Sequence, residues 1–515
     1  MRKLFIALCV FVSFSANSQA PIQEVFKQDW KIIPAYPNIN AYRADPFIPY
    51  SYLNSRVELS PTEQALLINF QKSENGVIVL TDELKVKWQT PIPGNLYALY
   101  KVNDKLIVVH NGTSEVRNED YSLLFATVLD PATGKKLLTK DILGGKPDHY
   151  IDLNTFPDPD KKELIIGFRH SAGLLKQKSK SITSIGREDY DITTKYDVVT
   201  FNENLEQIKK TSLPVKKSTV LYQVEMTINK NFILVYRESA GTIGLQVIAS
   251  QNQVWSKSYS LTSKERMFDN YRIIPSTLFP DVFFFSADYT TDDRDPALTL
   301  FRINYTTQEV KKFERIFTKD YRKELGTKWV SGDEEKSSRP IPRYWDYFKF
   351  SSITELKDKI VVVAESVYNE SYSMINNNGI GFGSTRSYNE NSDMLLTLFD
   401  NNLKVEDEKL IGKNYRYNSM IGNFASTYLK ENGLYIVTAS DERAGVCRAL
   451  VMKYNIQKKT FEFRKIADKG QRKGLRRIHP PSTIWFPKGY AIVFWDGDES
   501  IMFSGINSDL QLYSY

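Results

Sequence analysis

The stretch VIVLTDELKVKW, which begins at Val77, contains the pattern that decides the fold. A short apolar strand leads into a tight polar turn, and a second, more polar strand follows it. The pattern recurs in FATVLDPATGKKLL from Phe125 and VVTFNENLEQI from Val198. Five further copies are LQVIASQNQVW from Leu245, LTLFRINYTTQEV from Leu298, LLTLFDNNLKV from Leu395, LVMKYNIQKKTF from Leu450 and IMFSGINSDLQL from Ile501. Most copies begin about 50 residues after the preceding one, which indicates a repeat protein.

Two more apolar strands, joined by a short turn, precede each copy. Examples are LYALYKVNDKLIVVH (96–110) and FKFSSITELKDKIVVVA (348–364). The repeating unit is therefore four antiparallel strands, and such a sheet buries both faces only when copies stack radially. We expect an all-β fold, an eight-bladed β-propeller. Seven blades is the alternative, because the first unit, residues 50–90, is the least regular.

The turn segments LDPATGKKLL and LTDELKVKW resemble those of quinoprotein-like and WD-like propellers, and the resemblance in blade pattern covers most of residues 50–515. It implies an architecture and no particular activity. The quinone-dependent enzymes of that class carry an adjacent cysteine pair and regularly spaced tryptophans. This chain has neither feature, so we expect no cofactor.

The N-terminus has the pattern of a secretory signal peptide over residues 1–18. Arg2 and Lys3 precede an apolar run (4–14), and the small residues Ala16 and Ser18 follow it. This pattern predicts export to the periplasm or beyond in a Gram-negative bacterium. We expect residues 19–49 to be an extension that packs on the propeller. Residues 50–515 would then form one domain, with insertions at 171–195, 318–345 and 366–391.

Charge and cysteine content exclude several classes of function. The formal net charge of +7 falls to about +5 when the signal peptide is removed, which is too small to indicate a nucleic-acid or lipid partner. No other apolar run approaches the roughly 20 residues of a transmembrane segment. Cys9 leaves with the signal peptide, so Cys447 remains alone and neither an intrachain disulfide nor a cysteine zinc site is expected. The histidines show no metal-ligand spacing.

Every long loop is predicted to lie on one face of the ring. In a propeller, the connections between second and third strands share a face with those between blades, and here these connections hold all the insertions. Ordered long loops usually serve binding. Polar residues also gather where the second strands reach this face. The candidate ligand-binding residues among them are His110, Arg169, His170, Arg237 and Asp288.

Three further groups belong to the same face. Glu365, Asp441 and Asp496 are candidate catalytic carboxylates of the glycosidase kind, which requires two carboxylates about 5 to 10 Å apart. The segment 366–391 carries Tyr368, Tyr372 and Tyr388 among Ser, Asn and Gly, a mixture typical of antibody-like binding surfaces. The basic run 469–477 contains Arg472, Arg476 and Arg477, which favours a ligand with some negative character.

Three classes of function fit these features. The leading one is an exported propeller that binds a protein or glycan partner through the long-loop face, and the basic run favours an anionic partner. The second is a polysaccharide hydrolase or lyase that uses carboxylates at the mouth of the central channel. The third is a scaffold component of a cell-envelope complex. An enzymatic role is not the favoured interpretation.

Overall fold

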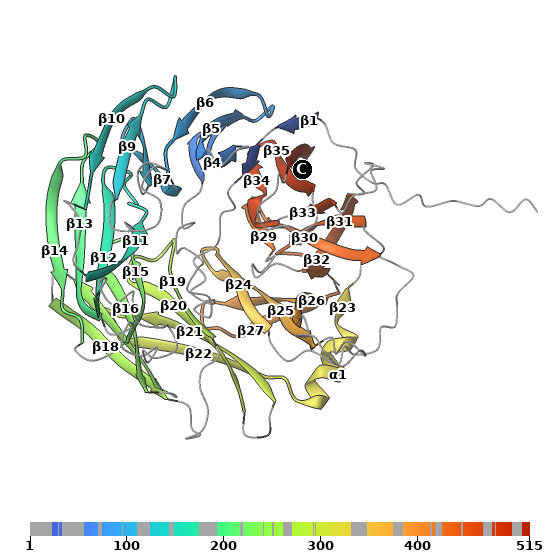
Figure 1. The fold of residues 1–515 in the computed structure, drawn as a ribbon. Coiled ribbons are helices and arrows are strands. Elements are labelled where there is room, and N and C mark those ends of the chain that lie inside the picture. Colours follow the sequence, from blue (N-terminus) through green and yellow to red (C-terminus); the bar gives the residue numbers. More distant parts are fainter. Residues whose placement is uncertain are drawn as a thin grey trace, which may run out of the picture.

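Eight blades, each built on four antiparallel strands and some with short additional strands, form a ring around a central axis in the computed structural model (Figure 1). It describes residues 23–28, 30–32, 56–70, 75–94, 96–110, 124–143, 149–174, 193–216, 220–239, 242–249, 252–260, 270–291, 293, 295–330, 348–373, 385–412, 415–417, 425–443, 446–466, 476–478, 480–496 and 507–515. The prediction of an eight-bladed β-propeller is confirmed, and the seven-bladed alternative is wrong.

The blades follow one another along the chain. Blade 1 holds β2 (Trp30–Ile32), β3 (Arg56–Ser60), β4 (Glu63–Phe70), β5 (Asn75–Thr81) and β6 (Val86–Ile92). Blade 2 holds β7 (Leu96–Val102), β8 (Lys105–His110), β9 (Phe125–Leu129) and β10 (Lys136–Asp141). Blade 3 holds β11 (His149–Phe156), β12 (Leu164–Leu174), β13 (Thr193–Phe201) and β14 (Gln207–Leu213). Blade 4 holds β15 (Val220–Met226), β16 (Phe232–Ser239), β17 (Thr242–Ala249) and β18 (Asn252–Ser260).

The second half of the ring carries additional short elements. Blade 5 holds β19 (Asn270–Pro275), β20 (Val282–Thr290), β21 (Pro296–Asn304) and β22 (Glu309–Ile316), followed by α1 (Lys319–Thr327). Blade 6 holds β23 (Trp329–Val330), β24 (Phe348–Glu355), β25 (Lys359–Ser373), β26 (Thr385–Asp400), β27 (Val405–Ile411) and β28 (Tyr415–Tyr417). Blade 7 holds β29 (Ser426–Lys430), β30 (Gly433–Arg443), β31 (Val446–Asn455) and β32 (Thr460–Ile466). Blade 8 holds β33 (Arg476–Ile478), a 3₁₀ turn (Pro480–Ser482), β34 (Ile484–Phe486), β35 (Gly489–Asp496), β36 (Asn507–Ser514) and β1 (Gln23–Gln28).

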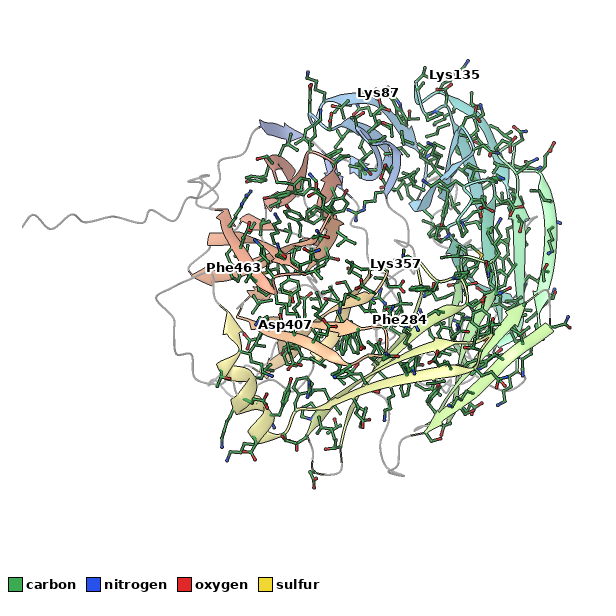
Figure 2. The ribbon with its side chains drawn as sticks, turned by 180° about the vertical axis from the view of Figure 1, so that it is seen from behind. Lys87, Lys135, Phe284, Lys357, Asp407 and Phe463 are labelled. Carbon is green, nitrogen blue, oxygen red and sulfur yellow. The ribbon has the colours of Figure 1, made fainter. Side chains whose placement is uncertain are left out.

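Hydrophobic patterning explains the position of each strand. The middle strands are buried on both faces, as in β20, where Phe283, Phe284 and Phe285 are all fully enclosed by neighbouring blades. The last strand of each blade lies at the outer rim (Figure 1), and β10 and β14 are almost wholly exposed there. Lysines line this rim, among them Lys87 and Lys135 (Figure 2), and charged side chains on an edge strand discourage pairing with other chains.

The N-terminal residues close the ring. Strand β1 pairs antiparallel with β36 and becomes the outermost strand of blade 8, while β2 pairs with β4 at the inner edge of blade 1. Both strands belong to the segment 19–49, which was expected to pack on the propeller as an extension. In the copy of the pattern that begins at Ile501, residues 501–506 lie outside the described residues. Strand β36 is the third strand of blade 8, and β1 takes the place of the fourth.

Two of the predicted insertions contain regular structure. In 318–345, Thr318 caps α1 by accepting a hydrogen bond from the Tyr321 amide, and β23 pairs in parallel with β27. In 366–391, β25 and β26 continue well past the rest of the blade as a β-hairpin. For 171–195, the flanking strands β12 and β13 extend into the insertion, and residues 175–192 lie outside the described residues.

Candidate functional site

Backbone register places the predicted polar residues at equivalent points of successive blades. Each lies near the end of a second strand, opposite a residue in the first half of the innermost strand. The pairs are His110 with Leu96, Arg169 with Asp152, Arg237 with Val220, Asp288 with Asn270, Glu365 with Lys349, and Asp496 with Arg476. These positions therefore share one face of the ring.

Most of the described side chains in this group are buried. His110 and Glu365 have at most 1% of their surface exposed, and Arg169 and Asp288 have 8%. His110 hydrogen-bonds through Nε2 to the Thr127 hydroxyl at 2.8 Å. Burial lowers the pKa of His110 to about 4, so its imidazole is neutral at neutral pH. The hydrogen-bond partner of His110 is thus another side chain of the protein.

Arg169 and Glu365 connect neighbouring blades. Arg169 in blade 3 donates to the carbonyl of Leu221 in blade 4 at 2.8 Å. Glu365 in blade 6 accepts from the amide of Ala425, just before β29 of blade 7, at 2.6 Å. An innermost strand has a neighbour on one side only, so its free backbone groups need partners from elsewhere. These two side chains supply such partners.

Three residues that the sequence analysis missed make the same kind of contact. Gln223 of β15 bonds both backbone groups of Ile273 in β19, with its amide nitrogen donating and its oxygen accepting at 3.1 Å each. Arg272 donates to the carbonyl of Ser351 in blade 6, and Arg56 donates to that of Thr483 in blade 8. Their signal in the sequence is a polar residue inside an otherwise apolar innermost strand, as in VLYQVEM and NYRIIP.

A titratable group belongs to this inner layer. Glu225 of β15 accepts a hydrogen bond from the Gln223 amide at 2.7 Å. Burial raises the pKa of Glu225 to about 7, while the bond from Gln223 and the positive charge of Arg272 oppose the rise. The charge of Glu225 thus changes near neutral pH.

His170 lies beside a buried carboxylate in blade 3. Its Nε2 is 3.4 Å from Asp197, which Lys195 approaches to 2.7 Å and Lys210 to 3.5 Å. Ser212 donates a hydrogen bond to Asp197 at 2.6 Å. Burial favours the neutral carboxyl, but the bonds from Lys195 and Ser212 outweigh it and lower the pKa of Asp197. In this cluster, the positive charges of Lys195 and Lys210 offset the negative charge of Asp197. The cluster lies on the outer part of the blade.

The hairpin of blade 6 brings the three predicted tyrosines together. Strands β25 and β26 run 15 and 16 residues, against 5 to 11 for the second and third strands of other blades. Tyr368 pairs with Glu390, Glu370 with Tyr388, and Tyr372 with Arg386. Because alternate residues of a strand share a face, these six residues lie on one face of the hairpin.

The opposite face of the hairpin has a different composition. Its register pairs are Val367 with Asn391, Asn369 with Asn389, Ser371 with Ser387, and Ser373 with Thr385. One set of register positions thus holds Tyr, Glu and Arg, and the other holds Val367 together with Asn, Ser and Thr. We call residues 367–373 and 385–391 the arm, and the set Tyr368, Glu370, Tyr372, Arg386, Tyr388 and Glu390 its aromatic face.

The remaining candidates are placed by their backbone alone or not at all. Arg476 and Arg477 form part of β33 and pair with Asp496 and Trp495 of β35. Asp441 lies in β30, where the register with β31 is irregular. Arg472 lies outside the described residues. The register therefore brings Arg476 next to Asp496, and it brings neither of them to Glu365.

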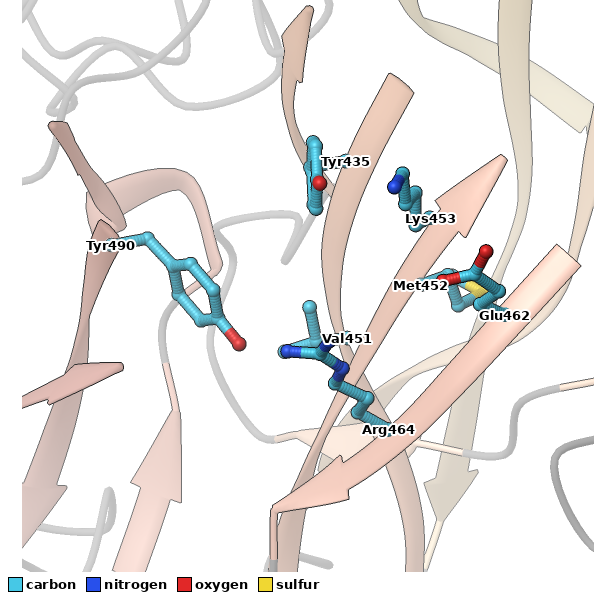
Figure 3. Close-up of a pocket in the computed structure, with 7 residues that line it drawn as sticks. All are labelled: Tyr435, Val451, Met452, Lys453, Glu462, Arg464 and Tyr490. Carbon is cyan, nitrogen blue, oxygen red and sulfur yellow. The ribbon is translucent and has the colours of Figure 1, made fainter. Parts of the chain in front are cut away.

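A small pocket lies between blades 7 and 8 (Figure 3). Arg464 of β32 and Tyr490 of β35 point toward one another across it, beside Tyr435. Its interior holds about 10 Å³, roughly the room of a single water molecule. The pocket is therefore too small for an organic ligand.

Two kinds of feature are absent from the described residues. No group of three or more His, Cys, Asp or Glu side chains is arranged to hold a metal ion. Within those same segments of the chain, no helix combines the length and apolar character that crossing a bilayer requires.

Comparison with known proteins assigns the chain to no family. No family model and no curated protein matches the chain. The WD40 domain of SCAP from fission yeast is 9% identical, with 95% of this chain and 99% of that chain covered and a TM-score of 0.40. BamB from Moraxella catarrhalis is 9% identical, with 89% and 94% covered and a TM-score of 0.34. YCF48, solved with a D1 peptide, is 10% identical, with 69% and 97% covered and a TM-score of 0.29. At such identities the similarity concerns the propeller fold alone.

Proposed function

We propose that this protein is an exported propeller that binds a partner protein through the long-loop face, with the aromatic face of the arm as the main contact. The observation that carries the proposal is the register of β25 and β26, which gathers Tyr368, Tyr372 and Tyr388 on one face. Tyrosines give large contact areas at low cost in conformational entropy, and adjacent charged groups give specificity. Such a surface suits a protein partner.

The alternative of a polysaccharide hydrolase or lyase has less support. A catalytic carboxylate must contact its substrate, whereas Glu365 is fully buried and bonded to the Ala425 amide. Asp496 lies opposite Arg476 in the register of β33 and β35, and the register brings no second carboxylate to this position. Partner binding therefore remains the function that this geometry supports best.

Export and the negative character of the ligand are further parts of the proposal. Residues 1–18 have the signal-peptide pattern, so the protein should occur in the periplasmic or extracellular fraction in a form that lacks them. The basic run 469–477, with Arg472, Arg476 and Arg477, was predicted from the sequence for the long-loop face, and it favours acidic groups on the partner. Cell fractionation followed by N-terminal sequencing tests the export.

Site-specific photo-crosslinking in the native host tests the binding surface. A photoreactive amino acid at Tyr372 or Tyr388 should give a discrete adduct with one partner. The same amino acid at Asn202 or Asn401, in turns on the opposite face of the ring, should give none. Asn369 is the matched control on the other face of the arm. Adducts from the opposite-face turns, with none from the tyrosine positions, would contradict the proposal.

A further inference from the structure

Strand β25 is paired along only one of its two edges where it forms part of the arm. Toward β26, the register continues from Val367 with Asn391 to Ser373 with Thr385. Toward β24, the register ends where Phe348 meets Ser366. Among the residues that the structure describes, no strand pairs with this second edge over residues 367–373. We call it the free edge of the arm.

The order of the strands in blade 6 shows where the free edge lies. The sheet runs β23, β27, β26, β25 and β24, and β24 is the innermost strand, next to the axis of the ring (Figure 1). The free edge is on the β24 side of β25 and therefore faces inward. The other edge of the arm is partly covered, because β28 pairs with residues 389–391 of β26. An added strand would thus find unpaired backbone on the inner side.

The fourth strands of the blades, at the outer rim, differ from the free edge in composition. Every one of them carries at least one lysine, and a lysine on an edge strand discourages pairing with another chain. These lysines are Lys27 in β1, Lys87 in β6, Lys136 and Lys140 in β10, Lys209 and Lys210 in β14, Lys257 in β18, Lys311 and Lys312 in β22, Lys409 in β27, and Lys465 in β32. Residues 367–373 contain no lysine, no proline and no glycine. The free edge thus lacks the protection that each rim strand has.

Toward its tip, the arm is a two-stranded ribbon. Residues 370–373 and 385–388 pair with one another, and the described part of the chain supplies no third strand there. A two-stranded ribbon is at best marginally stable in water, and a third strand adds a second ladder of hydrogen bonds. Unpaired backbone N–H and C=O groups in a row are matched by the main chain of an extended segment. The free edge therefore favours an extended segment as its occupant.

The register also defines which residues an added strand would meet. Tyr368, Glu370 and Tyr372 occupy alternate positions of β25, on the aromatic face. Residues directly opposite one another on neighbouring strands interact, and favourable pairs join aromatic with aromatic or β-branched residues and carboxylates with cations. The matching segment carries an aromatic or β-branched residue opposite each tyrosine and a Lys or Arg opposite Glu370.

We propose that the arm captures its partner protein by strand addition, in which an extended segment of the partner pairs with the free edge over residues 367–373. This inference rests on the proposed function, because it specifies how the arm holds a protein. The main chain of the segment supplies the hydrogen bonds, and its alternation of apolar and basic residues supplies the specificity. The acidic groups that the basic run 469–477 favours belong to other parts of the same partner.

Proline substitution in the full-length mature protein, combined with a photoreactive amino acid at Tyr388, tests this mode of binding. Position 388 lies in β26, so the crosslinker leaves β25 unchanged. Successive N–H groups of a strand point to opposite edges, so one of the variants Asn369→Pro and Glu370→Pro removes a donor from the free edge and the other removes one from the ladder with β26. Hydrogen exchange of the arm amides identifies the free-edge variant as the one whose arm stays protected. In that variant the yield of the adduct should fall about tenfold.

A matched pair of lysine substitutions gives a second test that leaves the backbone donors in place. Asn369 and Asn389 are register partners on the two strands of the arm. Asn369→Lys places on the free edge the residue that protects the rim strands, and it should lower the yield of the adduct about threefold. Asn389→Lys puts the same charge on the strand that β28 covers, and it should leave the yield unchanged.

The outcomes distinguish strand addition from the proposed function. An undiminished adduct in the free-edge proline variant, or equal adducts in Asn369→Lys and Asn389→Lys, would overturn strand addition and leave partner binding by the aromatic face in place. If both proline variants lose the protection of the arm, the lysine pair alone decides. A protein that carries the crosslinker at Tyr388 without other changes and gives no adduct would contradict the proposed function and strand addition together.

Discussion

At the scale of single residues, the polar groups at the ends of the second strands show what a sequence can and cannot reveal. Their position on one face was predictable from the order of strands and turns. Their burial was not, because the partners of Arg169 and Glu365 are backbone groups of the next blade, more than 50 residues away. Local sequence carries no signal for such a partner. The same reason explains why Gln223 was missed.

The contact between Glu365 and Ala425 can be tested by two substitutions. Glu365→Ala leaves a buried amide without its acceptor and should lower the free energy of unfolding by about 1 to 3 kcal/mol. Glu365→Gln retains an oxygen acceptor and should cost clearly less. Chemical denaturation gives both values. Equal stability of the two variants would contradict the bracing role, and a loss of an enzymatic activity in Glu365→Gln would support the hydrolase alternative.

Gly134 and Gln308 both lie in left-handed turns, with φ of +73° and +62°, and we expect them to respond in opposite ways to substitution. Gly134→Ala places a methyl group against Trp88 in a left-handed turn and should destabilise the protein by about 1 to 3 kcal/mol. Gln308→Gly relieves the left-handed strain and should leave stability unchanged or slightly increased. The midpoints of denaturation provide the comparison. A tolerated Gly134→Ala would show that the indole can move away from the turn.

Glu225 predicts a pH dependence of stability. Its pKa in the folded protein, about 7, is above the ordinary value of 4.5. Over this interval the folded chain therefore holds a proton that the unfolded chain has released, and rising pH favours unfolding. The contribution of Glu225 to the free energy of unfolding is fully present below pH 4.5 and is lost as the pH rises through about 7. In Glu225→Gln this loss should vanish, so the stability difference between variant and wild type should grow in favour of the variant from pH 4.5 to 8. Parallel pH profiles would contradict the assignment.

At the scale of elements, the repeats were predictable because each blade forms its strands and tight turns from about 50 consecutive residues. The length of β25 and β26 was not, since Tyr, Asn, Ser and Glu without apolar alternation look like a loop. Cross-strand pairing supplies the missing order there. Helix α1 in the 318–345 insertion was not predicted, for a related reason. A nine-residue helix with one fully buried residue, Leu325, has little apolar periodicity.

The arm should be dispensable for folding. Replacing residues 367–391 by a short Gly-Ser link removes strands that do not pair with β24 beyond Ser366. Among the described residues, the link also removes the pairing of residues 389–391 with β28. The free energy of unfolding should change by less than about 1 kcal/mol, because little apolar surface is lost. Loss of the photo-crosslinked partner with retained stability would support the binding role. A large loss of stability would show that the arm belongs to the core.

At the scale of the whole molecule, the position of the N-terminal strand joins two ends that are far apart in the sequence. The ring is complete only when β1 pairs with β36 in blade 8 and β2 pairs with β4 in blade 1. The sequence alone did not predict these pairings, because strands of Gln, Glu, Val and Lys do not indicate which sheet they join. Because each blade buries its faces against its neighbours, closure stabilises all of them.

The most direct test of this closed eight-bladed ring is a disulfide between its ends. Glu24 is paired with Gln511, and Val25 with Leu510. Successive antiparallel pairs alternate between wide and close spacing, so a cysteine pair at one of these two positions should meet disulfide geometry. In mature protein with Cys447 replaced by Ala, we expect one pair to oxidise spontaneously and raise the unfolding temperature, with the bond identified by peptide mass spectrometry. Failure of both pairs to cross-link in folded protein would contradict closure of the ring by the N-terminal strand.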